Sequence, residues 1–434
     1  SFARLLKSLC FMRHSLTVIL GLAVLAFALI GSGVSLQVSP QHPPVCSCSR
    51  QADSLFLIQT FFPATNGPAW AVDVPGGEIP WNTGAPLDQW VGVVLNAQGC
   101  VQELNLEMRD LSGAIPSDIG QLCALKKLIL SNNALGGGIP ASIGDLELLE
   151  QLWLINTGLG GPIPPEIGNL KMLFDLRLSD NQLSGNIPDE LGNCDGLFRL
   201  WLDDNQLIGE IPSGLGELPF LSIFFVDGNQ ISGCVPESFA TLFTLNQFEF
   251  FGNEIECLPD LSGTGLSCNR LRGQNNRLTF DDILPNIEDF CTSLFYAPQD
   301  SIGQTLLVSV PAGTNYAIDL GIDQTVPDNQ YQWWKNNVFY PPILNINQLI
   351  FNDIGFADQG VYRAEVTNSG APSLTLYSRE VTIDVFCAPE IVQLDTFICP
   401  GEVIQINGDQ YGTGFPVEGT YTFPGANRHG CDSV

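Results

Sequence analysis

Apolar residues return with a period of 24 residues along positions 101–259. One copy begins at Leu173 and reads L-F-D-L-R-L-S-D-N-Q-L-S-G-N-I-P-D-E-L-G-N-C-D-G. Seven copies keep the same phase without insertion or deletion, and they begin at Val101, Leu125, Leu149, Leu173, Leu197, Leu221 and Leu245. Repeats of this length cannot bury their apolar face alone, so the period predicts a solenoid in which each copy stacks on the next.

Each repeat predicts a short parallel strand and a turn. In L-x-x-L-x-L the leucines face the interior, and positions three, five, seven and eight face outward. An asparagine at position nine is expected to turn the chain and to bond backbone groups inside the coil; it occurs as Asn133, Asn181, Asn205, Asn229 and Asn253. Arg109 and Thr157 replace it in two repeats, which are therefore expected to be less regular.

The pattern divides the chain into seven segments. We predict upstream residues and a signal peptide at 1–35, a polar, Pro-rich tether at 36–52, an N-terminal cap at 53–100 and the seven repeats at 101–259. A C-terminal cap or linker follows at 260–292, alternating strands of an all-β sandwich at 293–387, and part of a further β-module at 388–434. The predicted fold class is a solenoid of short parallel strands with 3₁₀ or helical turns, followed by β-domains.

A signal peptide is predicted from the apolar run at 16–30. Met12 is the expected start, Arg13 and His14 precede the run, and small residues follow it at 31–35. An uncleaved anchor is the alternative, although a membrane span needs about 20 residues. We therefore expect a secreted or cell-surface protein that meets the membrane through export or anchoring. Attachment to a cell envelope would require a region beyond Val434.

Cysteine spacing predicts disulfides at both ends of the solenoid. Cys100 precedes Cys123 by 23 residues, as Cys234 precedes Cys257. A coil of 24 residues places such pairs on adjacent rungs about 5 Å apart, within reach of a disulfide. Cys268 and Cys291 are expected to close the C-terminal cap, and Cys194, without a stacked partner, is expected to be a buried thiol.

Several motifs resemble known families. N-G-P-A-W at 66–70, Trp81 and W-V-G-V at 90–93, together with L-x-G-x-I-P in the repeats, resemble plant-type leucine-rich-repeat proteins, particularly their bacterial and protist branch. Leu95 stands where that family usually has a cysteine. The residues around Trp333, Trp334 and D-Q-G-V-Y at 358–362 resemble an immunoglobulin-like domain, with a fibronectin-type sandwich as the alternative. Residues 388–434 resemble β-modules of surface proteins of marine Bacteroidota, a resemblance that implies a Cys399–Cys431 bridge. The sequence has no N-x-S/T motif, which also fits a bacterial source.

Charge and motif content exclude several functions. The formal charge is −29 at pH 7, from 17 basic and 46 acidic residues, which argues against binding nucleic acid. The chain has three histidines and lacks recognisable hydrolase, metalloprotease and phosphate-loop motifs. We therefore predict no catalytic residues, cofactor or metal. Calcium at the S-D-N, D-D-N and D-G-N tripeptides is a minor alternative to unliganded turn acids.

The outward positions of the repeats carry the candidate binding site. Position five holds Trp153, Arg177, Trp201 and Phe225 on successive rungs, and exposing large aromatic side chains is costly unless they bind something. The surrounding charged candidates are Asp175, Asp180, Arg199, Asp203, Asp204 and Asp227. The alternative is that these side chains only pack on one another.

These observations predict a recognition or adhesion protein rather than an enzyme. The concave face would bind a protein, such as a basic peptide, or a carbohydrate stacked on Trp153 and Trp201. A structural adhesin or matrix component without a ligand site is one alternative. A non-catalytic part of a larger exported enzyme is another.

Overall fold

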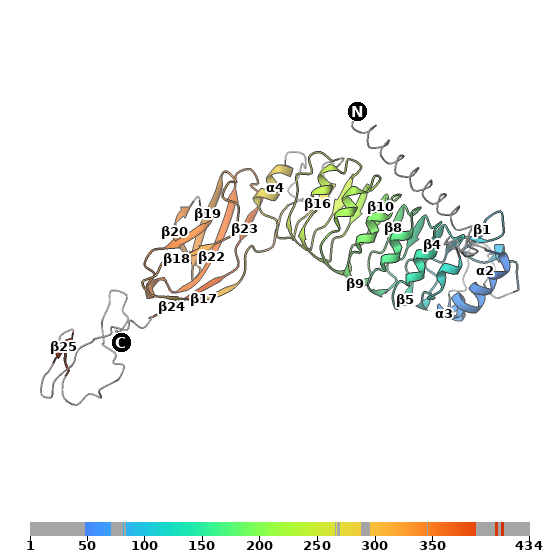
Figure 1. The fold of residues 1–434 in the computed structure, drawn as a ribbon, viewed down its shortest axis with the longest axis horizontal. Coiled ribbons are helices and arrows are strands. Elements are labelled where there is room, and N and C mark those ends of the chain that lie inside the picture. The colour runs from blue at the N-terminus through green and yellow to red at the C-terminus, as the bar shows by residue number, and fades with distance from the viewer. Residues whose placement is uncertain are drawn as a thin grey trace, which may run out of the picture. The chain divides into compact units, whose positions relative to one another are not determined.

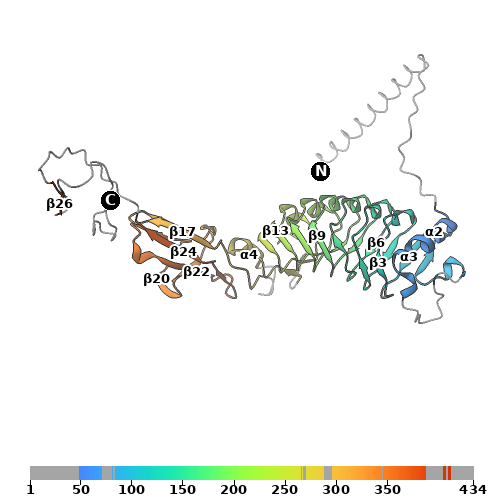
Figure 2. The same ribbon diagram turned by 90° about the horizontal axis from the view of Figure 1, so that it is seen from below.

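The structure is a computed structural model that describes residues 48–70, 81, 84–264, 266, 270–287, 296–344, 346–387, 404–406 and 409–411. Side chains are described throughout except at 342–344, 404–406 and 409–411. The described chain contains a solenoid of stacked coils, followed in sequence by a region of mainly antiparallel strands (Figures 1 and 2).

The N-terminal cap covers the first coil with a short helical segment and an aromatic cluster. The helical segment comprises α2 (Arg50–Phe56), the π-helix η1 (Leu57–Phe61) and α3 (Phe62–Ala64), and the 3₁₀ turns η2 (Gly67–Ala69) and η3 (Leu87–Gln89) follow. The ring of Trp70 packs on those of Phe61, Phe62 and Trp81, with ring centres 6.4, 5.0 and 4.9 Å apart. The ring of Trp81 packs in turn on that of Trp90, with ring centres 5.4 Å apart. This cluster shields the apolar end of the solenoid from water, as the aromatic pattern predicts.

The cap is attached to the first coil by a disulfide that the spacing argument does not predict. Cys100 is bonded to Cys48, with Cα atoms 5.9 Å apart, so the predicted Cys100–Cys123 bridge is wrong. The start of α2 lies over the first coil, where the buried carboxylate of Asp53 accepts a hydrogen bond from the Val101 amide at 2.7 Å. This position brings Cys48 within reach of Cys100. Cys123 is also disulfide-bonded.

A long sheet of nine strands runs through the solenoid, with one strand from the N-terminal cap and one from each coil. In spatial order its strands are β1 (Val93–Leu95), β2 (Val101–Asn105), β4 (Lys127–Ile129), β6 (Gln151–Trp153), β8 (Asp175–Arg177), β10 (Arg199–Trp201), β12 (Ile223–Phe225), β14 (Gln247–Glu249) and β16 (Leu271–Arg272). Apart from the antiparallel β1–β2 pair, all neighbours are parallel and in register. We call each coil a rung, and the outward side of this sheet the concave face.

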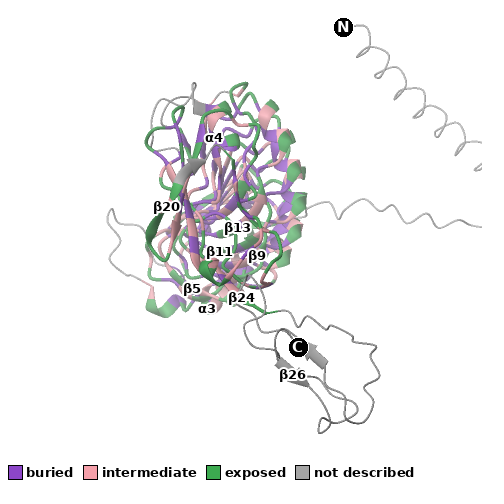
Figure 3. Cartoon of the chain, turned by 90° about the vertical axis from the view of Figure 1, so that its left-hand side faces the viewer, coloured by how far each residue is buried: buried purple, intermediate pink, exposed green. Residues whose placement is uncertain are grey.

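The core lies between the long sheet and the other sides of the coils. Leucines at positions one, four and six are fully buried, as at Leu173, Leu176 and Leu178, while turns on the outside are exposed (Figure 3). Each rung removes several large apolar side chains from water, which is the main favourable term in folding. The solenoid therefore gains its stability from contacts between neighbouring coils.

Shorter elements complete each coil. The second set of strands is β3 (Ser112–Ala114), β5 (Ala134–Gly136), β7 (Gly160–Gly161), β9 (Gln182–Asn186), β11 (Gln206–Gly209), β13 (Gln230–Cys234) and β15 (Glu254–Cys257). The 3₁₀ turns are η4 (Ile119–Gln121), η5 (Ala141–Asp145), η6 (Pro165–Asn169), η7 (Asp189–Asn193), η8 (Ser213–Glu217) and η9 (Glu237–Thr241). The second sheet is interrupted between β5 and β7, beside the rung in which Thr157 replaces the asparagine.

The asparagines at position nine form a hydrogen-bonded ladder inside the coils. Asn205 Nδ2 donates to the carbonyl groups of Leu178, Leu202 and Asp203 at 3.0, 3.1 and 3.0 Å. Its Oδ1 accepts from the Leu183 amide at 3.0 Å. One side chain thus satisfies four backbone groups of two adjacent rungs, which the turn cannot pair by itself.

The solenoid extends one rung beyond the seven repeats. Strand β16 pairs with β14, and Asn276 makes the same ladder bonds to the carbonyl groups of Phe250 and Gly273. Helix α4 (Phe280–Ile287) follows. Gln299 then continues the ladder, because its Oε1 accepts from the amides of Asn276 and Leu278, both at 3.2 Å. The repeat pattern does not predict this rung, because its strand is short and its spacing departs from 24 residues.

The disulfide predicted for the last regular repeats is present. Cys234 is bonded to Cys257, with Cα atoms 4.6 Å apart on the paired strands β13 and β15. Cys194 is a free, buried thiol, and burial raises its pKa to about 11. A thiol with this pKa remains protonated at neutral pH and is inert.

Two further sheets form the region after residue 305. The larger contains β17 (Leu306–Pro311), β24 (Val381–Phe386), β22 (Gly360–Asn368), β19 (Asn329–Lys335) and β20 (Val338–Leu344), with β23 (Thr375–Tyr377) beside β22. The smaller pairs β18 (Tyr316–Asp319) with β21 (Gln348–Phe351), and the 3₁₀ turn η11 (Phe356–Asp358) precedes β22. Trp333 is buried, Trp334 is not, and the Tyr362 hydroxyl donates to the Asp358 carbonyl at 2.5 Å.

Some predictions fall outside the described residues. They include the signal peptide with Met12, the cysteines Cys268, Cys291, Cys399 and Cys431, and most of the tether and of the module at 388–434. Strands β25 (Ile404–Ile406) and β26 (Asp409–Tyr411) are described within that module as an antiparallel pair. Cys387 is disulfide-bonded. Among the helices of the described segments, none has the length and apolarity to cross a bilayer.

Candidate functional site

A stack of four side chains occupies the centre of the concave face. Trp153, Arg177, Trp201 and Phe225 lie at paired positions on β6, β8, β10 and β12. The Arg177 guanidinium carbon is 4.1 Å from the ring centre of Trp153 and 4.2 Å from that of Trp201. The rings of Trp201 and Phe225 are stacked with centres 5.3 Å apart. We call these four residues the aromatic ridge.

Asp175 holds the arginine of the ridge in place. Its carboxylate receives two hydrogen bonds from Arg177, Nε to Oδ1 at 2.8 Å and Nη2 to Oδ2 at 2.9 Å. Arg199 Nη1 lies 3.4 Å from the same Oδ2. Asp175 is only 1% exposed and its oxygens are engaged, so it supports the ridge rather than contacting a ligand directly.

The stack determines which parts of the ridge are accessible. Trp201 has Arg177 on one side and Phe225 on the other, and one face of Trp153 is covered by Arg177. A sugar therefore cannot lie flat on Trp201, as the carbohydrate hypothesis requires. The ridge side chains pack on one another, as the packing alternative predicts. They nevertheless remain partly exposed and offer ring edges to a ligand.

The ridge is kept at some cost in stability. The indole Nε1 atoms of Trp153 and Trp201 are buried and have no hydrogen-bond partner among the described residues. Each unsatisfied buried donor costs roughly 1–3 kcal/mol. Features that lower stability without serving the fold are concentrated at functional sites, and this ridge is one such feature.

Four aspartates lie beside the ridge, immediately after the strands that carry it. Asp180, Asp203, Asp204 and Asp227 occupy positions seven and eight of three consecutive rungs. We call them the acidic row. Ser179, which is not among the predicted site residues, donates its hydroxyl to Asp203 Oδ1 at 2.6 Å. Its spacing of 24 residues from Asp203 was the available signal.

The acidic row is electrostatically strained. Burial, followed by repulsion from Asp203, Glu249 and Asp204, raises the pKa of Asp227 to about 7. Burial also raises the pKa of Asp203 and of Asp204, with neighbouring aspartates adding repulsion. Within the described parts of the chain, no cation forms an ion pair with these four carboxylates. The row therefore attracts cationic groups from outside the chain.

The described residues offer no metal centre at this row. No group of three or more His, Cys, Asp or Glu side chains in the described segments is arranged to hold a metal ion. The calcium alternative thus gains no support from the geometry. All three histidines, His14, His42 and His429, lie outside the described residues.

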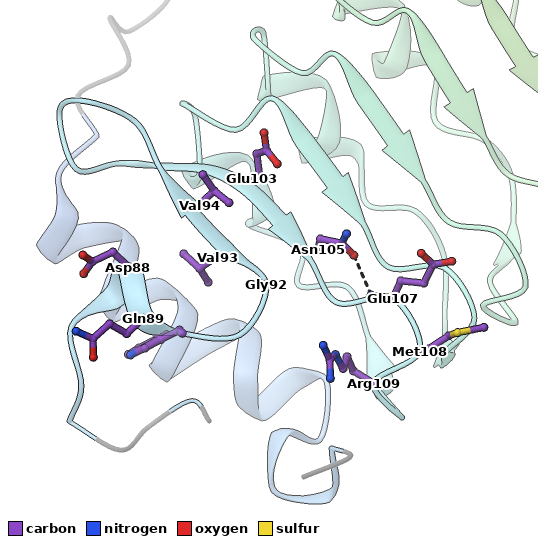
Figure 4. Close-up of a pocket in the computed structure, with 11 residues that line it drawn as sticks. Asp88, Gln89, Gly92, Val93, Val94, Glu103, Asn105, Glu107, Met108 and Arg109 are labelled. Atoms are coloured by element: carbon purple, nitrogen blue, oxygen red, sulfur yellow. Dashed lines mark hydrogen bonds between the residues drawn. The ribbon is translucent and has the colours of Figure 1, made fainter. Parts of the chain in front are cut away.

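A hollow of about 820 Å³ lies on the same face at its capped end (Figure 4). It is lined by Asp88, Gln89 and Trp90 of the cap, Gly92, Val93 and Val94 at β1, Glu103 and Asn105 of β2, and Glu107, Met108 and Arg109 of the following turn. Its acidic groups have partners: Asp88 pairs with Arg50, Glu103 with Lys127 at 3.0 Å, and Glu107 accepts from Asn132 at 3.1 Å. This hollow therefore provides a concave surface with polar groups, whereas the acidic row provides carboxylates that form no ion pair with a described residue.

Comparison with known proteins agrees with the repeat assignment. The family model described as Leucine Rich Repeat matches residues 124–146 and 172–194, so these segments are leucine-rich repeats. The matched segments fall within the solenoid that carries the ridge. No curated protein matches the chain.

Three solved structures to which the chain is similar are of plant proteins. The leucine-rich-repeat ectodomain of the receptor kinase GASSHO1/SCHENGEN3 from Arabidopsis thaliana, in complex with CASPARIAN STRIP INTEGRITY FACTOR 2, is 26% identical over 52% of this chain and 30% of that chain, with a TM-score of 0.45. The plant peptide hormone receptor RGFR1 in complex with RGF2 is 28% identical over 51% of this chain and 38% of that chain, with a TM-score of 0.43. A plant ice-binding protein is 24% identical over 61% of this chain and 90% of that chain, with a TM-score of 0.44. The chain thus spans about a third of the length of the two receptors.

Proposed function

We propose that this protein is a non-catalytic, extracellular recognition protein whose concave face binds a protein ligand. The observation that carries the proposal is that the acidic row, on the rungs of β8 to β12, lies beside the aromatic ridge, which extends from β6 to β12. Partly exposed aromatic and arginine side chains are the typical anchors of protein interfaces. Unpaired carboxylates beside them add charge complementarity for a basic partner.

A protein ligand is favoured over a carbohydrate. Sugar recognition by tryptophan uses the flat face of the indole, and both sides of Trp201 are occupied by neighbours in the ridge. Ring edges and carboxylates remain available, and both suit peptide groups. The structural-adhesin alternative rests on the packing within the ridge, but packing alone does not account for the unpaired acidic row.

We further propose that the strands at 293–387 form an immunoglobulin-like spacer. Buried Trp333, buried Ala364 at the usual cysteine position and the hydroxyl bond of Tyr362 support this class. The disulfides support an oxidising, extracellular compartment. Export through a signal peptide, a Bacteroidota-like source and envelope attachment through a region beyond Val434 remain part of this proposal.

The test is a selection of binders against three forms of the protein. A displayed library of random peptides and a glycan array are each exposed to the wild type, to Trp153→Ala/Trp201→Ala, and to a control, Gln206→Ala/Ile208→Ala. The control changes exposed residues of β11 on the second sheet. A Trp153→Phe/Trp201→Phe variant, which keeps stacking, separates loss of contact from loss of packing.

We expect the wild type and the control to enrich the same peptides, and the double alanine variant to enrich none of them while remaining folded. Enrichment of the same peptides by all three forms would overturn the assignment to the concave face. Binding to glycans instead, lost in the alanine variant, would overturn the choice of a protein ligand. Absence of any binder would favour the structural alternative.

A further inference from the structure

A third set of side chains lines the edge of the concave face opposite the acidic row. Five large apolar residues lie one to four positions before the strands β6, β8, β10, β12 and β14, and all are exposed: Leu148 (45%), Met172 (54%), Phe198 (37%), Phe220 (58%) and Phe243 (74%). We call them the apolar row. Because they precede their strands, they lie at the edge where the strands begin, whereas the acidic row lies where the strands end.

The apolar row extends along the solenoid. Its members fall on five consecutive rungs, which are about 4.8 Å apart in a sheet, so the row is about 19 Å long. The rung before it has Ala124 in this place, a small residue that is buried. A contiguous row of exposed apolar side chains is uncommon on a protein surface and marks a site of interaction.

The apolar row is connected to the ridge. The Arg199 guanidinium carbon lies 4.9 Å from the ring centre of Phe198, and the same guanidinium reaches Asp175 beneath the ridge. On the rungs of β8, β10 and β12 the three groups thus lie side by side: apolar side chains at one edge, the ridge in the middle and the carboxylates at the other edge. Across the strands, the concave face therefore changes from apolar at one edge to acidic at the other.

The acidic edge also contains a carboxylate that has no side-chain partner among the described residues. Asp227 is 8% exposed, and no described side chain donates a hydrogen bond to it or forms an ion pair with it. Its neighbour Val226 points into the core with no exposed surface, so alternation directs Asp227 to the concave side. A cationic ligand group beside this largely buried carboxyl group would favour its ionised form and would gain an ionic contact there.

We propose that the concave face binds an amphipathic basic segment of a partner protein, with its apolar side chains on the apolar row and its lysine or arginine side chains on the acidic row. The proposal rests on the proposed function and specifies the chemistry and the orientation of the ligand. A helix of about 13 residues matches the 19 Å length of the apolar row, and the acidic row lies along its central rungs, those of β8 to β12. Its diameter of about 10–12 Å lets opposite sides of one helix face the two edges.

The experiment uses two synthetic peptides of about 18 residues with the same leucine, phenylalanine and lysine content. In one, the apolar and basic residues lie on opposite faces of a helix, and in the other their order is scrambled. Affinities for the full chain are measured by fluorescence anisotropy at low and at physiological salt. Three variants are compared: Asp203→Asn/Asp227→Asn, Phe220→Ser/Phe243→Ser, and the control Asp189→Asn/Glu190→Gln, which removes the same charge from exposed positions of η7.

We expect the amphipathic peptide to bind at least about tenfold more tightly than the scrambled one. The Asp203→Asn/Asp227→Asn variant should lose affinity and much of the salt dependence, because it removes the ionic contacts. The Phe220→Ser/Phe243→Ser variant should lose affinity with its salt dependence unchanged, and the control should match the wild type.

Equal affinity for the two peptides would overturn the proposal, and so would equal losses in the control and in the acidic-row variant. These outcomes are distinguishable from failure of the proposed function. If the selected library peptides require Trp153 and Trp201 but bind both row variants normally, the proposed function is retained and the proposed orientation of the ligand is wrong. If the selected peptides still bind after both tryptophans are replaced, the proposed function itself is wrong.

Discussion

Arg177 and Asp175, two residues apart on strand β8, form a double hydrogen bond that fixes the guanidinium between two tryptophan rings. The carboxylate is buried beneath the concave face, while the arginine is partly exposed above it. The ridge therefore depends on a charge that a ligand cannot reach. This arrangement separates the residue that positions the site from the residues that contact a ligand.

Removal of the Asp175 carboxylate should destabilise the solenoid. In Asp175→Ala, Arg177 loses both hydrogen bonds and Arg199 loses its nearby anion, which leaves two cations poorly compensated. We expect a loss of about 2–4 kcal/mol in the free energy of unfolding, measured by urea denaturation. Asp180→Ala is the control and should change stability little, because it removes an exposed carboxylate on the same rung that forms no ion pair with a described residue. Equal effects of the two substitutions would contradict the supporting role of Asp175.

The acidic row should make stability depend on pH. The pKa of Asp227 is about 7 in the folded protein, above its value of 3.8 in a model compound, so the folded state binds this proton more tightly than the unfolded state. Stability from this group is therefore greatest at low pH and falls as pH rises from about 4 to about 7. Asp227→Asn should stabilise the protein at pH 8 by about 1–2 kcal/mol after allowance for solvent screening, and less at pH 5.

Urea denaturation of wild type and Asp227→Asn at both pH values measures this effect. The difference between the two proteins is the informative quantity, because Asp282 and Asp53 also have a raised pKa and remain in both. A difference that is the same at pH 5 and pH 8 would be contrary to the electrostatic strain described here.

Substitution of an asparagine in the ladder should strongly destabilise the solenoid. Asn205→Ala leaves three carbonyl groups and one amide without their partner inside the coil. We expect a loss of about 3–4 kcal/mol in the free energy of unfolding. Asn169→Ala, at an exposed position of η6, is the matched control and should cost less than about 1 kcal/mol. A small effect at Asn205 would mean that water replaces these bonds.

The cap disulfide can be tested directly. Proteolysis without reduction, followed by mass spectrometry, should recover a peptide pair joining Cys48 to Cys100. Cys48→Ser should lower the free energy of unfolding by about 2–4 kcal/mol, since it opens a loop of 52 residues. Recovery of a Cys100–Cys123 pair would contradict the structure and restore the prediction from spacing.

The repeat period predicted most of the solenoid, because buried leucines and the asparagine ladder follow a fixed spacing. It did not predict the Cys48–Cys100 bridge, since contact between the cap and the first rung depends on where α2 lies. The ridge residues were identified from their position in the repeat. Their mutual stacking and the burial of Asp175 depend on side-chain conformations, which a periodic pattern does not determine. The apolar row was missed because its members vary by a few positions between repeats.

The central claim is that the ridge on β6 to β12 contacts a protein ligand. Its most direct test is the affinity of a peptide selected on the wild type, measured by calorimetry against the wild type, Trp153→Ala/Trp201→Ala and Gln206→Ala/Ile208→Ala. We predict at least about a tenfold loss for the tryptophan variant, with the fold retained, and no change for the control. Unchanged affinity in the folded tryptophan variant would contradict the account.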